Sequence, residues 1–286
     1  MQSMRCYVQM RGYSLFQFID DIGSIGEVCK KLNHFLAQRH CLTAQLLLKY
    51  DYVIFIDGDS GVINPYRCFE EYINPNVSMH FLLRLRTGEV QSGHYIAKNT
   101  SFSRKFLHDL AQEIHTKHNE QPAIHNGLYN TVLSNTEKKT CVKFKDNRSK
   151  YWSYVGCIVG SLRKRSNISG NKVQIYSRGQ SFARDAEATD FFWSHTDFLL
   201  HALKPHYDNM YMRHADDVMF NRRLRESDCN ANMWVIPYSQ QYIVNQTQMN
   251  KIWKKFEGQW QRKWSRKFAL LQDISSCWPR CYHVLA

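Results

Sequence analysis

Two aspartates separated by a single glycine directly follow a short apolar run. The run is Tyr52 to Ile56 (YVIFI), and Asp57-Gly58-Asp59 comes next. Alternate residues leaving a strand can point the same way, so both carboxylates can approach one cation. Hard oxygen ligands suit Mg²⁺ or Mn²⁺, which complete their shells with phosphate oxygens and water. The pattern therefore predicts that Asp57 and Asp59 hold Mn²⁺ or Mg²⁺ against a diphosphate.

A cation at this position would stabilise the negative charge that develops on a nucleoside diphosphate as it leaves a sugar. The formal net charge of +13 would help to capture the same anion. The competing interpretation is a plain turn, because Asp, Gly and Ser dominate turns. The apolar run before the motif and Asn64-Pro65 after it favour the metal site.

Helical and extended patterns alternate around this motif. Glu27 to Lys49 carries apolar residues at helical spacing, and Tyr52 to Ile56 lacks alternation, as in a strand covered on both faces. Further on, Ser78 to Leu85 and Gly93 to Lys98 indicate strands, and Ser101 to Lys117 indicates a helix. This order predicts an α/β fold with a mainly parallel central sheet, in which ligands bind beyond the carboxyl ends of the strands.

An ordered series of short motifs extends over most of the chain: Arg39-His40-Cys41, Tyr50 to Pro65, Ser92-Gly93-His94-Tyr95 with Lys98-Asn99, Gln121 to His125, Arg178-Gly179-Gln180, Arg184-Asp185, Asp197-Phe198-Leu199-Leu200-His201 and Cys277-Trp278-Pro279-Arg280-Cys281. With these motifs the sequence resembles the GT-A class of nucleotide-sugar-dependent glycosyltransferases, whose metal-binding Asp-x-Asp follows an internal strand. More closely, it is similar to a nematode-expanded domain of unknown function that is related to the Golgi α-1,2-galactosyl- and mannosyltransferase family.

The resemblance implies a set of metal ligands. Asp57 and Asp59 would bind the metal and the diphosphate, and His201 would be the late third metal ligand. Taken alone, a histidine in an apolar stretch such as that around His201 is more often an ordinary core or surface residue.

The resemblance also implies donor contacts and a catalytic residue. Arg39 would face the phosphates or ribose of the donor, and Ser92 and Gly93 would line the sugar pocket. Gln121 would lie near the reacting carbon as the catalytic residue. Without the resemblance, Arg39 could be a solvated residue of a helix, and Gln121 could be an ordinary polar surface residue. The stretch with Arg178, Arg184 and Asp185 could form a lid or the acceptor edge, or a solvated loop.

The sequence departs from the family pattern at three places. Glu120 stands where relatives usually carry an aspartate before the amide residue, and Ala202-Leu203 stands where they often carry Gly-Trp. The chain also starts within the first helix of the family pattern, which implies that the first strand of the GT-A sheet is missing.

We therefore predict a Rossmann-like GT-A domain over residues 1–205, N-terminally incomplete, and a C-terminal extension over 206–286 packed on the same domain. The predicted reaction is metal-dependent transfer of a hexose, galactose from UDP-galactose, to a glycan hydroxyl, with retention of configuration following from the resemblance. The alternative is a non-catalytic, degenerate glycosyltransferase-like binding protein. A metal-dependent phosphohydrolase is a further candidate, but the lysine and later acids that such enzymes use have no clear counterparts.

Charge and cysteine content bear on partners and compartment. The basic residues are thinly spread and accompany no nucleic-acid recognition motif, so we expect no nucleic-acid partner. Nine cysteines form no CxxC pair, although Cys277 and Cys281 could close a small disulfide loop, and an odd count leaves one thiol unpaired. Five N-glycosylation sequons favour a secretory lumen: Asn76, Asn99, Asn147, Asn167 and Asn245.

No apolar run in the chain is long enough to span a bilayer. We expect localisation in the Golgi or another secretory-pathway lumen, with membrane attachment only through an N-terminal anchor that is not in this chain.

Overall fold

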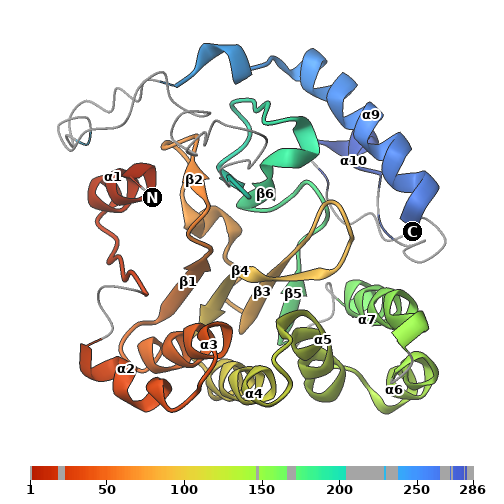
Figure 1. Cartoon of the computed structure of the whole chain (residues 1–286). Helices are drawn as coiled ribbons and strands as arrows, with labels where there is room; N and C mark the ends of the chain where they lie inside the picture. The colour runs from red at the N-terminus through yellow and green to blue at the C-terminus, as the bar shows by residue number, and fades with distance from the viewer. Residues whose placement is uncertain are drawn as a thin grey trace, which may run out of the picture.

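The computed structural model describes residues 2–18, 23–145, 148–165, 172–203, 229, 238–264, 271, 273–279 and 281. Within these residues, two β-sheets are surrounded by helices, four of which (α3, α4, α5 and α7) lie along one side of the larger sheet (Figure 1). The helices and strands in chain order are α1 (Gln2–Arg11), α2 (Gly23–Lys30), α3 (Phe35–Leu46), β1 (Tyr52–Ile56), β2 (Gly61–Val62), β3 (Met79–Leu83), β4 (Val90–Lys98), α4 (Ser101–Lys117), α5 (Glu120–Thr131), α6 (Asn135–Cys141), α7 (Tyr151–Arg165), β5 (Val173–Ile175), β6 (Ala183–Asp185), β7 (Leu199–His201), α9 (Gln246–Trp264) and α10 (Ile274–Cys277).

Both sheets are mixed. The larger sheet has the order β1-β4-β3-β5, with antiparallel β1–β4 and β3–β4 pairs and a parallel β3–β5 pair. The smaller sheet has the order β2-β7-β6, with an antiparallel β2–β7 pair and a parallel β6–β7 pair. The α/β class is confirmed, but the mainly parallel sheet is not. A tight turn between Arg84 and Glu89, with Gly88 at φ 75°, folds β4 back antiparallel on β3.

Strand β1 has the bounds that its composition indicates but lies at the edge of the described sheet rather than inside it. Its side chains alternate between two apolar clusters, which explains the absence of a polar face. Val53 and Phe55 pack against the cluster formed with α3 and α4, whereas Tyr52, Ile54 and Ile56 pack against the cluster on the other face. Coverage on both faces therefore made an edge strand resemble an internal one.

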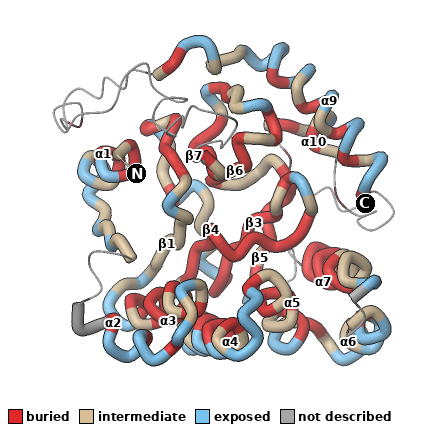
Figure 2. The backbone as a smooth tube through the Cα atoms, in the orientation of Figure 1, coloured by how far each residue is buried: buried red, intermediate tan, exposed pale blue. Residues whose placement is uncertain are grey.

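The helical layer is held by an amphipathic α4 that has the predicted bounds. The Thr100 hydroxyl caps the first turn by accepting from the Ser103 amide (3.1 Å), and His118 ends the helix in a left-handed conformation. The inward face of α4 packs into the larger core, and the central strands β3 and β4 are buried almost along their whole length (Figure 2). Core residues of α4 are Phe106, Leu107, Leu110, Ala111 and Ile114.

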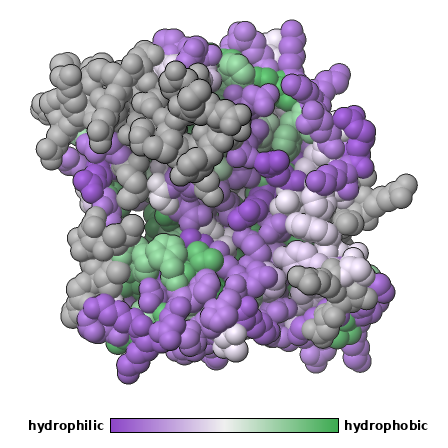
Figure 3. All heavy atoms as spheres, viewed as in Figure 1, coloured by the Kyte–Doolittle hydropathy of each residue, from purple (hydrophilic) through white to green (hydrophobic). Residues whose placement is uncertain are grey.

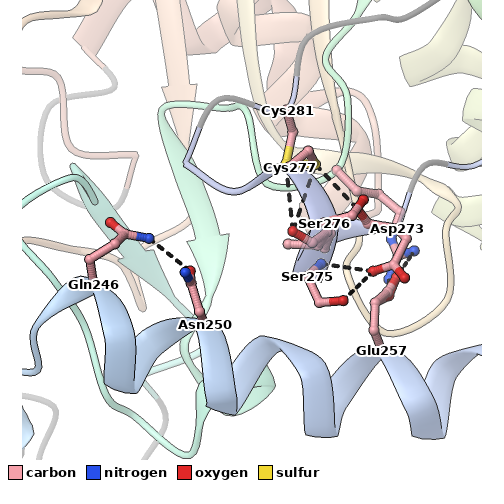
Figure 4. The surroundings of a disulfide bond; sticks show 10 residues. Gln246, Asn250, Glu257, Asp273, Ser275, Ser276, Cys277 and Cys281 are labelled. Carbon is pink, nitrogen blue, oxygen red and sulfur yellow. Dashed lines mark hydrogen bonds and ion pairs between the residues drawn. A yellow bond between two sulfur atoms is a disulfide. The ribbon is translucent and has the colours of Figure 1, made fainter.

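The described C-terminal part packs on this body through α9. Arg178, in the turn after β5, pairs with Glu257 of α9 (Nη1 to Oε1, 2.6 Å) and lies over the Trp260 ring at 3.8 Å. Beside α9, Asp273 caps α10 by accepting from the Ser275 amide at 2.8 Å (Figure 4). The predicted boundary between 205 and 206, and most of the following thirty residues, lie outside the described residues.

Four disulfides cross-link the chain and leave Cys68 as the free thiol, as the odd count predicts. The predicted small loop closed by Cys277 and Cys281 is present (Figure 4). The other three bonds are Cys6–Cys229, Cys29–Cys41 and Cys141–Cys157.

The face drawn in Figure 3 is mostly hydrophilic, with apolar side chains gathered in small patches. Among the described residues, six large hydrophobic side chains are exposed: Phe16, Val28, Phe35, Leu48, Tyr66 and Val142. No helix in this part of the chain combines the length and apolar character that crossing a bilayer requires.

Candidate metal centre

Pairing of β2 with β7 brings His201 close to the turn that contains Asp57 and Asp59. The turn that starts at Asp57 runs into β2, where Gly61 is opposite Leu200 of β7. The next residue of β7, His201, therefore lies beside the turn, and the Leu203 amide donates to the Asp59 carbonyl (3.0 Å). Three residues predicted from sequence to share one metal are thus brought together although about 140 residues separate them.

Four ionisable side chains converge at this point. His201 Nε2 lies 3.4 Å from Asp59 Oδ1 and 3.7 Å from Asp57 Oδ2. Asp57, His94 and His201 each offer one ligand atom, and these three atoms lie within 4.8 Å of one another. The ligand atoms of one ion bound at about 2.1 Å lie about 3.0–3.4 Å apart when they are neighbours and at most about 4.2 Å apart when they are opposite, so an inward movement of about 1 Å would let this group hold a divalent cation.

The other ring nitrogen of His201 is held by a carboxylate. His201 Nδ1 lies 2.8 Å from Asp185 Oδ1 and 3.0 Å from Gln91 Nε2. The parallel β6–β7 register places Asp185 directly beside His201, on the same face of the small sheet. A carboxylate on the remote nitrogen is the usual support of a metal-binding histidine. Burial lowers the pKa of His201, but the nearby carboxylates of Asp185 and Asp59 outweigh it and raise the pKa to about 9.

His94 completes the group from β4. It is fully buried, and its Nε2 lies 2.8 Å from the Ser60 hydroxyl. Its Nδ1 is buried without a hydrogen-bond partner among the described residues. Its ring lies edge to face with that of His201, with centroids 4.5 Å apart. Burial holds the pKa of His94 well below its usual range, so the ring is neutral.

A buried ion-pair network supports Asp57 from the α3 side. Arg39 Nη1 donates to Asp57 Oδ1 (2.6 Å), and Arg39 Nε donates to Glu120 Oε1 (2.9 Å). His40 Nε2 lies 2.7 Å from the same Glu120 oxygen, and its Nδ1 lies 3.0 Å from the Tyr95 hydroxyl. Although burial raises it, the pairing with His40 and Arg39 holds the pKa of Glu120 at about 2. Arg39 is thus engaged with protein carboxylates, and its contact with a donor stays a prediction.

Gly93 leaves space for the first aspartate. The Asp57 amide donates to the Gly93 carbonyl (2.9 Å), which continues the β1–β4 pairing by one residue. A Cβ placed on Gly93 would lie 1.9 Å from Asp57 Oδ2, so any other residue would displace this carboxylate. Gly93 therefore contributes to the site by shape, and its contact with a sugar stays a prediction.

Ser92 and Gln121 lie together beside the cluster, within hydrogen-bonding distance (3.1 Å). When the Gln121 amide nitrogen donates to Glu89 Oε1 (2.8 Å), its oxygen can accept from Arg84 Nη2 (3.1 Å) and from the Ser92 hydroxyl. Ser92 is fully buried in this arrangement. The geometry thus places both residues in a supporting polar network, and a catalytic role for Gln121 stays a prediction.

The stretch with Arg178 and Arg184, which was considered as a lid, contributes both arginines to the protein interior. Arg178 and Arg184 are buried, and both are paired with buried carboxylates, Glu257 and Asp197. The expectation of a lid or solvated loop was therefore wrong for these two residues. Asp185 is also buried and contacts the candidate metal cluster through His201.

A small pocket of about 60 Å³ lies away from the cluster, toward the N-terminal end of β7. Its lining includes Leu199 of β7 but none of the four convergent side chains. Other residues that line it are Arg67, Tyr72, Gln180, Thr196, Trp278 and Pro279. The convergent side chains of the cluster therefore lie outside this pocket.

Fold and site together define a mixed α/β protein with a carboxylate–histidine cluster at the end of a strand. The sequence profile described as "Protein of unknown function, DUF273" matches residues 4–215, and the chain belongs to this family. The expected likeness to a domain of unknown function is confirmed to that extent. A search of curated proteins gave no match. Among solved structures, the chain is similar to "a glycosyltransferase involved in the glycosylation of the major capsid of PBCV-1", with 12% identity, a TM-score of 0.35, and coverage of 70% of this chain and 83% of that one. A likeness this weak carries no argument about function.

Sequence reasoning missed two members of the site. His94 was noted only as part of a motif, because a histidine inside a strand pattern carries no sign of its direction. Asp185 was placed in a polar, basic stretch that looks solvent-exposed. The signal that could have found them is pairing with strands that carry the predicted ligands, which a single sequence does not reveal.

Proposed function

We propose that this protein is a metal-dependent glycosyltransferase that moves a hexose from a nucleotide-sugar donor to a glycan hydroxyl with retention of configuration. The observation that carries the proposal is the convergence of Asp57, Asp59 and His201 at the end of β1. Two carboxylates and an imidazole on one side leave the remaining positions of a cation to phosphate oxygens and water, as in sites that bind a metal–diphosphate complex.

The chain's own residues would position this complex. Arg39 and Gly93 fix the direction of the Asp57 carboxylate, and Asp185 fixes the ring of His201 with Nε2 toward the cluster. A bound cation would neutralise charge on the departing diphosphate. The basic balance of the whole chain favours capture of this anionic donor.

The donor and the compartment are part of the same proposal. UDP-galactose is the donor to test first, because it follows from the sequence resemblance to the Golgi galactosyl- and mannosyltransferases. Four disulfides and five sequons support maturation in a secretory lumen, since disulfides persist in oxidising compartments. We propose the Golgi lumen as the compartment in which the protein acts.

The proposal is tested by calorimetric titration of the purified chain with UDP, with and without Mn²⁺. We expect manganese-dependent binding that is lost in Asp59→Ala. The control is Asp109→Ala, because Asp109 is a partly exposed aspartate of α4 that pairs with Lys105 at the surface.

Each outcome bears on the proposal. Binding that needs manganese and Asp59 supports a donor site, and transfer from UDP-galactose to an acceptor glycan then supports catalysis. Donor binding with neither hydrolysis nor transfer would favour the degenerate binding protein. A folded chain that binds neither UDP nor UDP-galactose in the presence of Mn²⁺ would exclude the proposed function.

A further inference from the structure

The Nδ1 atom of His94 is an anomaly for a protein interior. It is buried, has no hydrogen-bond partner among the described residues, and belongs to a ring that is 0% exposed. Leaving a buried polar atom unpaired costs about 1–3 kcal/mol, so such atoms call for a specific explanation. The neighbours of His94 suggest one, because it shares a tight group with Asp57 and His201.

We propose that His94 Nδ1 is a direct metal ligand, so that the site is a centre of two histidines and two carboxylates that prefers transition metals over Mg²⁺ and Ca²⁺. The inference rests on the proposed function in using the same cation site. It goes further by assigning a ligand outside the Asp-x-Asp motif and by specifying which class of cation the protein selects.

Hydrogen bonding prepares both imidazoles for the same ion. His94 can donate its Nε2 proton to the Ser60 hydroxyl (2.8 Å), which leaves a lone pair on Nδ1. His201 can donate its Nδ1 proton to Asp185 (2.8 Å), which leaves a lone pair on Nε2. Each ring would thus keep one nitrogen held by the protein and bind the ion through the other. For His201 this means that Nε2 gives up its proton and its contact with Asp59 when the ion binds.

The relative position of the rings allows joint binding. They lie edge to face, with an interplanar angle of 69°, so their lone pairs are not forced into parallel directions. One ligand atom from each of Asp57, His94 and His201 lies within 4.8 Å of the other two. Neighbouring ligands of one ion bound at about 2.1 Å lie about 3.0–3.4 Å apart, so the side chains have to close by about 1 Å. A shift of this size is within ordinary side-chain movement.

Ligand chemistry sets the expected selectivity. Carboxylates bind Mg²⁺, Ca²⁺ and Mn²⁺, whereas imidazole favours later transition metals such as Co²⁺ and Zn²⁺. With two imidazoles, the protein should bind Co²⁺ and Zn²⁺ most tightly, Mn²⁺ next, and Mg²⁺ least. Loss of His94 should weaken Co²⁺ binding by at least about tenfold and change Mg²⁺ binding much less, because Mg²⁺ gains little from the nitrogen.

The experiment is titration of the full chain with CoCl₂, followed by visible absorption and by calorimetry, with MgCl₂ titrated separately. The variants are His94→Ala and His94→Gln, of which the second keeps a polar group for Ser60. The control is His80→Gln, because His80 is an equally buried histidine of the neighbouring strand β3 whose Nε2 accepts from the Asn74 amide (2.9 Å). Thermal unfolding checks that each variant is folded.

The outcomes separate this inference from the proposed function. We expect both His94 variants to lose cobalt affinity and change the absorption bands, and the control to match the wild type. Unchanged cobalt affinity and spectrum in folded His94 variants would overturn the His94 assignment and leave the donor site standing. A wild type that binds cobalt no better than Asp57→Asn would remove the metal site, and the proposed function with it.

A measurement without variants covers the case in which the His94 variants do not fold. Pulsed electron paramagnetic resonance of the Mn²⁺-loaded wild type detects the nitrogens bound to the metal. Two coordinated imidazoles support the inference, and a single one overturns it.

Discussion

A cluster of buried charged side chains lies at each end of strand β7. The two clusters differ in how completely their polar atoms are hydrogen-bonded within the protein. Before the strand, Asp197 accepts from Arg184 Nε (2.5 Å) and Nη2 (2.9 Å), and the Ser194 amide donates to the same carboxylate (3.0 Å). Arg184 also donates to the Thr189 hydroxyl and to the Phe192 carbonyl. Every charge in this group has a partner within the protein.

At the other end of β7, the cluster around His201 is built differently. Two carboxylates approach one ring nitrogen at 3.4 and 3.7 Å, longer than a good hydrogen bond, and His94 Nδ1 has no partner in the described part of the chain. Burial raises the pKa of Asp57 despite the nearby Arg39 and His201. A fully paired buried group stabilises the fold by itself, whereas the group around His201 leaves His94 Nδ1 without a partner among the described residues, which fits the proposed ligand site.

The largest expected effect is on the fully paired group. Asp197→Ala leaves the Arg184 guanidinium buried without its carboxylate, so we expect a loss of about 3–5 kcal/mol in the free energy of unfolding, measured in urea. Asp57→Asn should cost less than about 1 kcal/mol, because Arg39 keeps Glu120 and a desolvated charge is removed. Equal losses in the two variants would contradict the distinction between the groups.

The next effect is on the shape of the cluster. Gly93→Ala places a methyl group on the Asp57 carboxylate, and the rotated carboxylate should bind Co²⁺ about 10–100-fold more weakly in calorimetry. The matched control is Gly58→Ala in the same motif, where an added Cβ meets nothing within 4 Å. If both variants bind cobalt like the wild type, the position of Asp57 does not matter for metal binding.

A smaller effect, about tenfold in Co²⁺ affinity, is expected from Asp185→Asn. If the asparagine oxygen keeps the bond that the Leu85 amide makes to Asp185 Oδ2 (3.2 Å), its amide group faces His201 Nδ1. The ring would then accept at Nδ1 and carry its proton on Nε2, where the metal should bind. Affinity measured across several metals tests this, and the fold should be intact by circular dichroism. Undiminished affinity would mean that Asp185 does not set the tautomer.

Prediction from the sequence succeeded where a short stretch of residues carries both the structural pattern and the functional motif. The Tyr52–Ile56 run gave a strand with the correct bounds, and the motif series led to Asp57, Asp59 and His201, which the fold brings together. It failed where long-range pairing decides. Three features leave no periodic pattern in a single sequence. They are the antiparallel β3–β4 hairpin, the edge position of β1, and the burial of Arg184 against Asp197, thirteen residues away.

The same limit explains why the ligand set could be predicted only in part. An Asp-x-Asp motif is local, so its two carboxylates can be recognised together. His94 joins them only because β4 pairs with β1, and Asp185 joins His201 only through the β6–β7 register. Supporting residues of a site are therefore the least predictable, since they depend on which strands become neighbours.

The smallest effect concerns the turn that follows His201. Ala202 has φ 63°, a left-handed conformation that costs a non-glycine residue about 1–2 kcal/mol. Ala202→Gly relieves this strain but adds about 0.4–1 kcal/mol of chain entropy to the unfolded state, so we expect a net gain of a few tenths to about 1 kcal/mol in urea unfolding. Ala111→Gly inside α4 is the control and should lose about 1 kcal/mol or more. Metal affinity should not change in Ala202→Gly, because Leu203 keeps its bond to Asp59. A stability loss similar to that of the control would show that the left-handed turn is not strained.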